Sequence, residues 1–256
     1  MEVILNINDL MYKNIFNGLS IYIEKNKIID ISGQNKCGKT TLLRILNREI
    51  VNDFNIVLRD KSIYDYSLEE YSNRVQTVFP MEILYREETV EDVLFTKEEN
   101  IEKRDFILKS LKLERLLQNE LSTLSIKEII LVQIVKAISN AREIVLLDSL
   151  DSYFSKEELS NIYFLFKKCI EKFDLTFVIT CTSLEETLFA DELLVINDGR
   201  IILHGEPLQV LEKDNILNKA GLDIPFIIDL SVKLKDYDLI DRIILDRNKL
   251  INTLWK

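Results

Sequence analysis

The chain has 256 residues, a formal net charge of −10 and 47% hydrophobic residues. That hydrophobic fraction excludes an intrinsically disordered protein, and the acidic balance argues against a nucleic-acid partner. The apolar runs, such as Ile144–Leu147, are far shorter than the roughly 18 residues that a membrane-spanning helix needs. Three widely spaced cysteines indicate neither a disulfide framework nor a zinc site, so we expect a reduced, cytoplasmic protein.

Short apolar segments alternate with helical patterns along the first 205 residues. Strands are expected at 3–7, 21–23, 28–31, 75–79, 144–147, 176–180, 193–196 and 201–203. Helices are expected directly after Gly33, at about 89–117, and at 126–139, 157–173 and 184–188. This alternation predicts an α/β domain with a mainly parallel sheet. Residues 206–256 have a helical pattern and are expected to form a small appendage.

Two residue types are scarce. The six glycines are about 2% of the chain, where about 7% is usual, and the single histidine is His204. One histidine limits any chemistry that needs imidazole. The chain is rich in Ile, Lys, Asn, Leu and Glu, so compositional bias can account for part of both scarcities.

The segment Gly33–Thr40 matches the pattern G-x-x-x-x-G-K-[ST] between a predicted strand and a predicted helix. Such a loop points backbone N–H groups at phosphate oxygens, and the helix N-terminus adds a favourable dipole. Lys39 is expected to reach the β- and γ-phosphates, and Thr40 to bind Mg²⁺ through its hydroxyl. The residues expected to bind ATP here are Gly33, Gln34, Asn35, Lys36, Cys37, Gly38, Lys39, Thr40 and Thr41. The alternative is an ordinary strand–turn–helix with a surface lysine.

Asp148 ends the apolar strand predicted at 144–147. An aspartate alone in such a place is more often a turn residue or a helix cap. With a phosphate loop upstream, the carboxylate is expected to emerge beside that loop and to hold Mg²⁺ through water. Thr40 and Asp148 are therefore the predicted metal site.

Four segments carry a resemblance to the ATP-binding subunits of ABC transporters, and more narrowly to the ATPase subunit of energy-coupling factor importers, which take up vitamins and metal ions. They are Ile29–Leu46, the stretch Val78–Pro80 with Glu88–Val93, Phe177–Pro207, and the G-L-D-x-P segment Gly221–Pro225. The resemblance implies a P-loop NTPase fold. It places an ABC-type nucleotide-binding domain at 1–205, with an antiparallel β subdomain and a helical subdomain at about 85–140, and a C-terminal helical dimerisation region at 206–256.

The same resemblance implies a function. Two ATP-binding subunits face each other head to tail, sandwich ATP and Mg²⁺ between them, and rock a membrane scaffold as they close and open. The expected partners are a second ABC ATPase subunit, in a homodimer or a heterodimer, and a transmembrane scaffold subunit. The expected place is the cytoplasmic face of the cell membrane, as a peripheral subunit. Tyr12 lies where the family has an aromatic residue that stacks on adenine, although a core or surface tyrosine is an equal alternative.

The residues that would hydrolyse ATP depart from the family pattern. Ser149 stands where the family has the glutamate that polarises the attacking water, and a general base is typically worth about 10²–10⁴-fold in rate. Counting without gaps from Asp148 puts Cys181 at the position of the family's histidine. Pro80 takes the position of the Q-loop glutamine, and Ser155 that of the D-loop aspartate. We therefore assign no catalytic residue and expect hydrolysis at this site to be slow or absent.

The signature L-S-G-G-Q is altered as well. Two pairs compete for it, Leu121-Ser122 and Leu124-Ser125, and the spacing to the strand-end aspartate favours the second. Ser125 is then retained, while Ile126 and Lys127 replace the two glycines that let backbone N–H groups approach the γ-phosphate. Lys127 is a possible source of charge in their place.

Two positions within the phosphate loop are also unusual. Lys36 stands where the family favours glycine, and a left-handed backbone there would cost roughly 1–2 kcal/mol. Cys37 lies beside two lysines and a helix N-terminus. It is either a reactive thiol with a lowered pKa or a small filler, and the second interpretation is preferred.

Together these features predict a degenerate ABC-type ATP-binding subunit of an energy-coupling-factor-like importer, which keeps its nucleotide-binding residues and lacks those for hydrolysis. One alternative is an active ABC ATPase with atypical catalytic residues. Another is a regulatory or scaffold protein that binds ATP and takes no part in transport. The transported solute is not encoded in this chain, because a separate membrane subunit selects it in this family.

Overall fold

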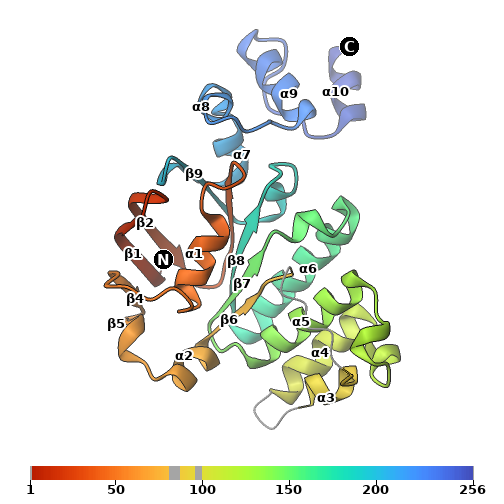
Figure 1. The fold of residues 1–256 in the computed structure, drawn as a ribbon. Coiled ribbons are helices and arrows are strands. Elements are labelled where there is room, and N and C mark those ends of the chain that lie inside the picture. Colours follow the sequence, from red (N-terminus) through yellow and green to blue (C-terminus); the bar gives the residue numbers. More distant parts are fainter. Residues whose placement is uncertain (1, 81–86, 96–99, 256) are drawn as a thin grey trace.

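A computed structural model describes residues 2–80, 87–95 and 100–255 of the chain. Two sheets form its centre (Figure 1). The larger sheet has the order β10-β9-β3-β8-β7-β6, and the smaller sheet has the order β2-β1-β4-β5. All neighbours in the larger sheet are parallel except β9 and β10, so the predicted mainly parallel α/β sheet is confirmed.

The strands and helices have the following bounds. The strands are β1 Val3–Tyr12, β2 Phe16–Glu24, β3 Ile28–Gly33, β4 Ile56–Leu58, β5 Lys61–Ser62, β6 Val75–Val78, β7 Ile144–Asp148, β8 Thr176–Cys181, β9 Glu192–Asn197 and β10 Arg200–Gly205. The helices are α1 Lys39–Leu46, α2 Leu68–Arg74, α3 Val90–Leu94, α4 Ile101–Leu111, α5 Ile126–Asn140, α6 Lys156–Phe173, α7 Pro207–Leu211, α8 Asp214–Lys219, α9 Phe226–Asp236 and α10 Arg247–Leu254. Short 3₁₀ turns include η4 at Leu150–Ser152 and η5 at Glu186–Phe189.

Two of the predicted helices differ from the structure. The single helix expected at about 89–117 is instead the short α3 followed by α4, which begins where the Asn100 side chain accepts a hydrogen bond from the Lys103 backbone. The helix expected at 184–188 is the 3₁₀ turn η5. In the region expected as a helical subdomain, residues 85–86 and 96–99 lie outside the described residues.

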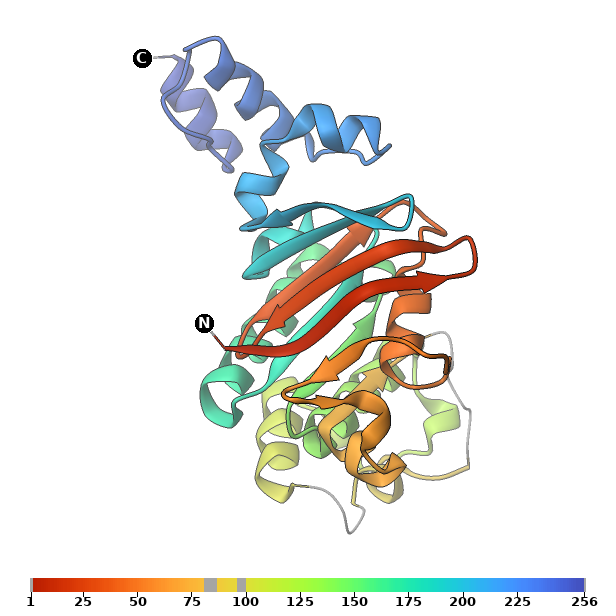
Figure 2. The same ribbon diagram turned by 90° about the vertical axis from the view of Figure 1, so that its left-hand side faces the viewer.

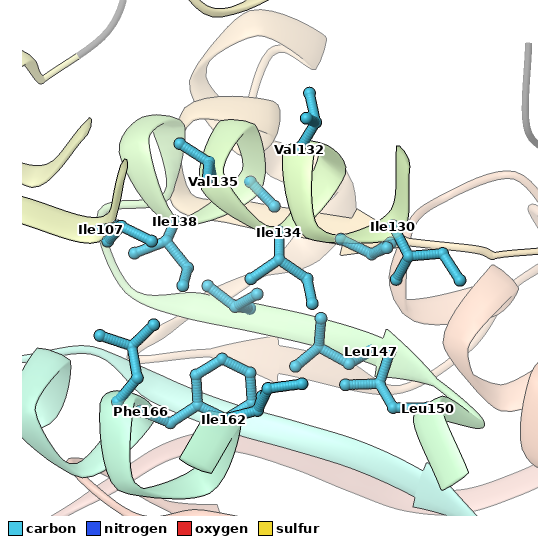
Figure 3. Close-up of a cluster of buried hydrophobic side chains, with 14 of the residues drawn as sticks. Ile107, Ile130, Val132, Ile134, Val135, Ile138, Leu147, Leu150, Ile162 and Phe166 are labelled. Carbon is cyan, nitrogen blue, oxygen red and sulfur yellow. The ribbon is translucent and has the colours of Figure 1, made fainter. Parts of the chain in front are cut away.

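Helices α5 and α6 cover one face of the larger sheet, and α1 lies between its other face and the antiparallel sheet (Figure 1). The apolar residues of α5 recur at helical spacing, so Ile130, Ile134 and Ile138 point together toward β7 and α6 (Figure 3). Phe166 of α6 stacks on Phe177 of β8 with ring centroids 4.3 Å apart. This packing fixes where α5 and α6 begin relative to the end of β7.

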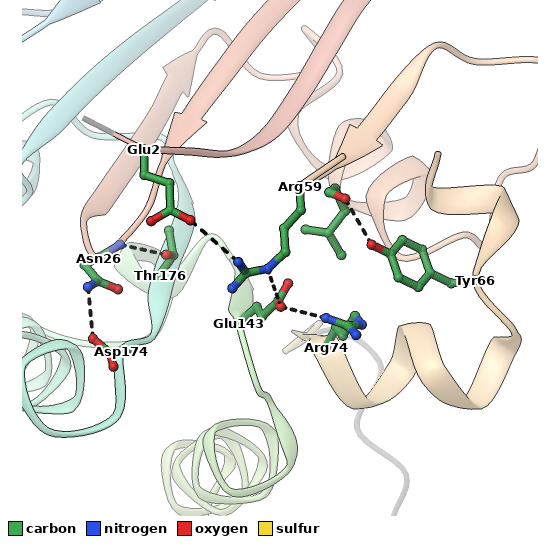
Figure 4. Close-up of polar contacts among 9 residues, drawn as sticks. Glu2, Asn26, Arg59, Tyr66, Arg74, Glu143, Asp174 and Thr176 are labelled. Carbon is green, nitrogen blue, oxygen red and sulfur yellow. Dashed lines mark hydrogen bonds and ion pairs between the residues drawn. The ribbon is translucent and has the colours of Figure 1, made fainter. Parts of the chain in front are cut away.

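A buried carboxylate joins the two sheets at the opposite end of β7 (Figure 4). Glu143 accepts hydrogen bonds from Arg59 Nε and Arg74 Nη1, both at 2.7 Å, and Glu2 lies 3.6 Å from the same Arg59. A buried charge with two arginine partners is strongly destabilised when either partner is removed. The antiparallel sheet is therefore held in a defined place over the phosphate-loop strand β3.

The C-terminal helices α8, α9 and α10 lie at the end of the molecule opposite α3 and α4 in both views (Figures 1 and 2). Leu217, Ile228 and Val232 of these helices are buried in a cluster that also includes Leu193 and Val195 of β9. Several large apolar side chains stay exposed on them, among them Phe226, Tyr237 and Trp255 at 77%, 78% and 85%. No helix within the described residues combines the length and apolar character needed to cross a bilayer.

Candidate functional site: a phosphate loop and two capped helices

The loop between β3 and α1 leaves the N-terminus of α1 open. All six residues of β3 are buried, and the chain then turns so that Gly38 precedes α1 with φ +105°. A Cβ at Gly38 would lie 2.6 Å from Ile15 Cγ2 and 2.9 Å from Phe16 Cζ, so only glycine fits. No side chain caps α1, and its first turn holds no acidic residue. Its backbone N–H groups are therefore available to an anion.

Lys39 is folded back over this loop. Its side chain is buried, and its ammonium donates hydrogen bonds to the carbonyl oxygens of Gly33 at 2.5 Å and Gln34 at 3.1 Å. A phosphate oxygen is a stronger acceptor than either neutral carbonyl. Lys36 has φ +70°, so the left-handed conformation considered from the sequence is present, at a cost of roughly 1–2 kcal/mol.

A cavity of about 310 Å³ lies directly against this loop. It is lined by Ile15, Asn35, Lys36, Gly38, Lys39, Thr40, Thr41, Ser149 and Thr182. A second cavity, of about 300 Å³, shares Ile15, Asn35 and Lys36 with the first and also includes Gln34, Cys37 and Gly199. The predicted binding residues are thus brought together with the end of β7, as the motif requires.

Asp148 ends β7 beside the phosphate loop, and its carboxylate accepts hydrogen bonds from threonine hydroxyl groups. Thr40 Oγ1 donates to Oδ2 at 2.8 Å, and Thr180 Oγ1 donates to Oδ1 at 2.6 Å. The lone pairs of the Thr40 hydroxyl stay available, so this pair fits Mg²⁺, which prefers one or two protein oxygens with phosphate oxygens and water. Among the described residues, no group of three His, Cys, Asp or Glu side chains could hold a metal ion.

Ser149 lines the phosphate cavity in a left-handed conformation, with φ +50°. Its backbone N–H donates to Thr180, and its hydroxyl lies 3.2 Å from Asp148 Oδ1, to which it donates. The side chain at the family's glutamate position is therefore present at the cavity wall, but it is a hydrogen-bond donor to a carboxylate and not a base.

Cys181 does not lie on the wall of the phosphate cavity. It is the last residue of β8, its side chain is 2% exposed, and its thiol faces the carbonyl of Ile31 at 3.8 Å. Burial, helped by the negative charges of Asp30 and Asp151, raises its pKa well above the usual range. Thr182, which sequence counting missed, is the residue at the cavity. All six residues of β8 are buried, so no alternation of exposed and buried positions signalled where the chain emerges.

Three further predicted residues lie as follows. The thiol of Cys37 is half-buried against Gly33, and burial raises its pKa more than the charge of Lys39 lowers it, which is contrary to a reactive thiol. Tyr12 packs edge-on against Phe54 at 5.8 Å and is not in the lining of either cavity beside the loop. Pro80 is buried just beyond β6.

The N-terminus of α5 is closed by its own side chains. Ser125 is the N-cap residue, its hydroxyl accepts from the backbone N–H of Glu128, and the Glu128 carboxylate accepts from the backbone and hydroxyl of Ser125 at 3.0 and 2.8 Å. Lys127 turns away and binds both carboxylate oxygens of Glu158 on α6, at 2.7 and 2.8 Å. Ser155 and Glu158 form the same kind of reciprocal cap on α6. Ile126 stays 49% exposed.

Comparisons with known proteins agree with this fold. The ABC transporter family matches residues 16–151. The chain is 26% identical over 248 residues to the energy-coupling factor transporter ATP-binding protein EcfA of Pediococcus pentosaceus, covering 88% of this chain and 87% of that one. It is 27% identical over 253 residues to the protein EcfA1 of Lactobacillus delbrueckii subsp. bulgaricus, covering 93% and 89%.

Solved structures are similar as well. The cbiO1 protein of Clostridium perfringens, part of the ABC transporter complex cbiONQ, has a TM-score of 0.73 at 24% identity, covering 90% of this chain and 99% of that one. A nucleotide-free ATP-binding cassette from an ABC transporter also has a TM-score of 0.73 at 24% identity. The family match spans more than half of the chain, from β2 through the phosphate loop to Asp151. This chain belongs to the ABC transporter family and has the fold of its ATP-binding domain.

Proposed function

We propose that the chain is the ATP-binding subunit of an energy-coupling-factor-like ABC importer for vitamins or metal ions. It binds Mg-ATP at a degenerate site and pairs with a second ATPase subunit to drive a transmembrane scaffold, as a peripheral subunit on the cytoplasmic face of the membrane. The observation that carries this proposal is an open, uncapped α1 beside the Thr40–Asp148 pair, with a serine in place of the base. The similarity to EcfA and EcfA1 supports the transporter class.

The nucleotide-binding step uses groups that already converge on one cavity. The β- and γ-phosphates would take the ammonium of Lys39 from its two carbonyl acceptors and accept from the first N–H groups of α1. Mg²⁺ would supply charge neutralisation of the phosphates and would be held by the Thr40 hydroxyl and, through water, by Asp148. Lys36 also lines the cavity and adds a second positive charge.

The hydrolysis step lacks its base. The Ser149 hydroxyl already donates its proton to Asp148, and the Thr182 hydroxyl donates to Asp151 at 2.6 Å. Neither group can take a proton from water at neutral pH. Since general-base assistance is worth about 10²–10⁴-fold, turnover at this site should fall by that order.

The face that would complete a partner's nucleotide site is altered in a different way. The carboxylate of Glu128 occupies the N-terminus of α5, where a γ-phosphate would need backbone N–H groups. Lys127 is paired with Glu158 and offers no spare charge. Pairing with the second subunit is therefore proposed to rest on the C-terminal helices, where Phe226, Tyr237 and Trp255 present apolar surface.

Nucleotide binding tests the site. We expect the purified chain to bind Mg-ATP, and Lys39→Ala to weaken binding by about 10–100-fold, because it removes a charge-assisted hydrogen bond worth about 1.5–3 kcal/mol. Lys168→Ala, on the exposed face of α6, is the matched control and should leave the affinity unchanged. Equal affinity of Lys39→Ala and the unaltered chain would refute the assignment of the phosphate loop.

Turnover separates the proposal from the active-ATPase alternative. The chain with Ser149→Glu and Thr182→His should gain ATPase activity, whereas Ser149→Glu with Cys181→His should not, because the side chain at position 181 is buried beside β3. A loss of turnover in the first variant would favour an active enzyme with atypical groups. Co-purification with a transmembrane scaffold and a second ATPase would support transport, and its absence would favour a regulatory or scaffold protein.

A further inference from the structure

Gln34 connects the phosphate loop to the C-terminal region. It is the first residue after β3, and its side chain is exposed. Its backbone carbonyl accepts hydrogen bonds from the ammonium of Lys39 at 3.1 Å and from the backbone N–H of Cys37 at 3.2 Å. Its side-chain Nε2 donates to the carbonyl of Gly221 at 3.3 Å. One residue therefore contacts both the lysine that would bind phosphate and the first residue of the 221–225 segment.

Gly221 fits closely against Gln34. It has φ +65°, and a Cβ in its place would lie 1.8 Å from Gln34 Nε2, so any side chain at this position would displace Gln34. Gly221 donates its own N–H to the carbonyl of Asn218 in α8, and Leu222 donates to that of Leu217. These two backbone hydrogen bonds hold the turn that leads from α8 toward α9. A change at Gln34 therefore reaches the start of α9 through a single turn of the chain.

A cavity of about 540 Å³ lies beside this contact. Its lining comes from three segments: residues 33–35 of the phosphate loop, residues 182–184 after β8, and residues 221–223. The Gln34 side chain thus has open space next to it, and it can leave Gly221 without displacing packed groups. Leu222 is buried in one cluster with Leu193 of β9, so the sheet keeps hold of the C-terminal region when the Gln34 contact breaks.

Nucleotide binding would change the hydrogen bonding of Gln34. The ammonium of Lys39 would leave the Gln34 carbonyl for a phosphate oxygen, which is the stronger acceptor. The carbonyl would then be left with a neutral donor, the N–H of Cys37. Hydrogen bonds from charged donors are the stronger kind, so the peptide that carries the Gln34 side chain loses the stronger of these two restraints. The bond to Gly221, at 3.3 Å, is longer than the usual length of about 2.9–3.0 Å and is the weak link in this chain of contacts.

We propose that Gln34 couples the phosphate loop to the C-terminal region: bound nucleotide releases the 221–225 segment from Gln34 and so frees the start of α9. This inference rests on the proposed function, because it requires that the phosphate loop binds a nucleotide. Coupling between two sites is reciprocal, so a contact that opposes binding in the nucleotide-free chain must raise the affinity when it is removed. The helices proposed for pairing with the second subunit thereby respond to whether nucleotide is bound.

Hydrogen exchange of the full chain, followed by mass spectrometry with and without saturating Mg-ATP, tests this coupling. The chain is kept monomeric by light scattering, so that subunit pairing does not protect the same amides. In peptides that span Gly221 and Leu222, Mg-ATP should speed exchange about threefold or more, because the N–H bonds to α8 open more often. Gln34→Ala should exchange at the faster rate without nucleotide and respond to Mg-ATP less than about twofold, and it should bind Mg-ATP at least as tightly as the unaltered chain.

Gln209→Ala is the matched control, because the exposed Gln209 on α7 donates to Glu206 and not to the phosphate loop. It should respond to Mg-ATP as the unaltered chain does. Gly221→Ala keeps the test decisive if Gln34→Ala disturbs the loop, since it displaces the Gln34 side chain from the C-terminal side and should also abolish the response. Unchanged or slower exchange in an unaltered chain that binds Mg-ATP, or an equal response in Gln34→Ala, would overturn the inference and leave the proposed function intact. A chain that binds no Mg-ATP would overturn both.

Discussion

Helices α1 and α5 begin in different ways: the N-terminus of α1 is open, and that of α5 is closed by its own side chains. At α1 the preceding residue is Gly38, no side chain caps the helix and the first turn carries no acid. At α5 the side chains of Ser125 and Glu128 satisfy each other's backbone N–H groups, and Lys127 is tied to Glu158 of α6. An open helix end can bind an anion, whereas an end filled by its own carboxylate is stable without one.

The difference shows how a binding site can be lost without loss of the fold. Glycine at the N-cap position leaves the N–H groups of the helix exposed, and a serine cap there is more stable by only a few tenths of a kcal/mol. Ile126 and Lys127 favour the helix more than glycines would, and the cap makes the N-terminus of α5 a poorer phosphate site. The open end of α1 keeps that cost, which indicates that nucleotide binding is retained there.

Gly38→Ala should have the largest effect, because it places a methyl group at the N-terminus of α1, where there is no room for one. The new Cβ would overlap Ile15 and Phe16, and the residue would need a φ of +105°. We expect a loss of more than about 2 kcal/mol in the free energy of unfolding, together with loss of nucleotide binding. Urea denaturation and nucleotide titration measure the two effects. Gly205→Ala is the control for backbone strain alone: Gly205 has φ +159°, and a Cβ there has its nearest neighbour at 3.7 Å, so this variant should lose less stability and keep nucleotide binding. Similar behaviour of both variants would contradict the packing argument.

Gly221→Ala should have a smaller effect, on the contact between the C-terminal region and the phosphate loop. Gly221 has φ +65°, its carbonyl accepts from Gln34 Nε2 at 3.3 Å, and an added Cβ would displace that Gln34 side chain from its place beside the phosphate loop. We expect a loss of about 2 kcal/mol in the free energy of unfolding, of which roughly 1 kcal/mol comes from the left-handed backbone and the rest from the overlap with Gln34. In a Gln34→Ala background the overlap is relieved, so the loss should shrink to the backbone cost alone. Equal losses in both backgrounds would show that the C-terminal segment and the phosphate loop are not coupled.

Much of the open end could be predicted from the sequence, because it depends on residues close together in the chain. The motif Gly33–Thr40, the strand before it and Asp148 all lie where the pattern places them. The contact between Asp151 and Thr182 could not be predicted from the sequence, because a side chain there joins the segments that follow β7 and β8. The placement of Cys181 at the family's histidine position stays a prediction; the side chain itself is buried, and the sequence could not show this because β8 is buried along its whole length and gives no alternation to count.

The closed N-terminus of α5 can be predicted in part from the sequence. Ser125 and Glu128 have the spacing S-x-x-E, which is the sequence signature of a reciprocal cap. That spacing predicts a capped helix whether or not the segment is compared with the glycine-rich signature. The contact between Lys127 and Glu158 was not readable, because it depends on how α5 and α6 pack over β7.

Ser125→Ala tests the closed end directly. It removes the side-chain oxygen that caps α5, so we expect a loss of about 1 kcal/mol in the free energy of unfolding. The affinity of the chain's own phosphate loop should not change. Ser122→Ala is the matched control: Ser122 belongs to the competing Leu-Ser pair and lies in a 3₁₀ turn, where its hydroxyl donates to the exposed side chain of Glu120. If Ser122→Ala were the more damaging change, α5 would not be closed in the way described.

The smallest effect is expected from acid, which should reduce the stability that the capped N-termini of α5 and α6 contribute and leave the uncapped N-terminus of α1 unaffected. The hydrogen bond from Lys127, and to a lesser degree those from Ser155, lower the pKa of Glu158 from 4.5 to about 2. Because the folded-state pKa is depressed, the contribution of Glu158 is complete above about pH 4.5 and is lost as the pH falls toward 2. Glu158→Gln should therefore flatten the fall in stability across that window, by less than about 0.5 kcal/mol since the pair is solvent-exposed. Glu157→Gln, whose carboxylate has no ion-pair or hydrogen-bond partner within the described residues, is the control for urea unfolding at pH 5 and pH 3. If both variants flatten the curve equally, the Lys127–Glu158 contact contributes nothing of its own to holding α5 and α6 together.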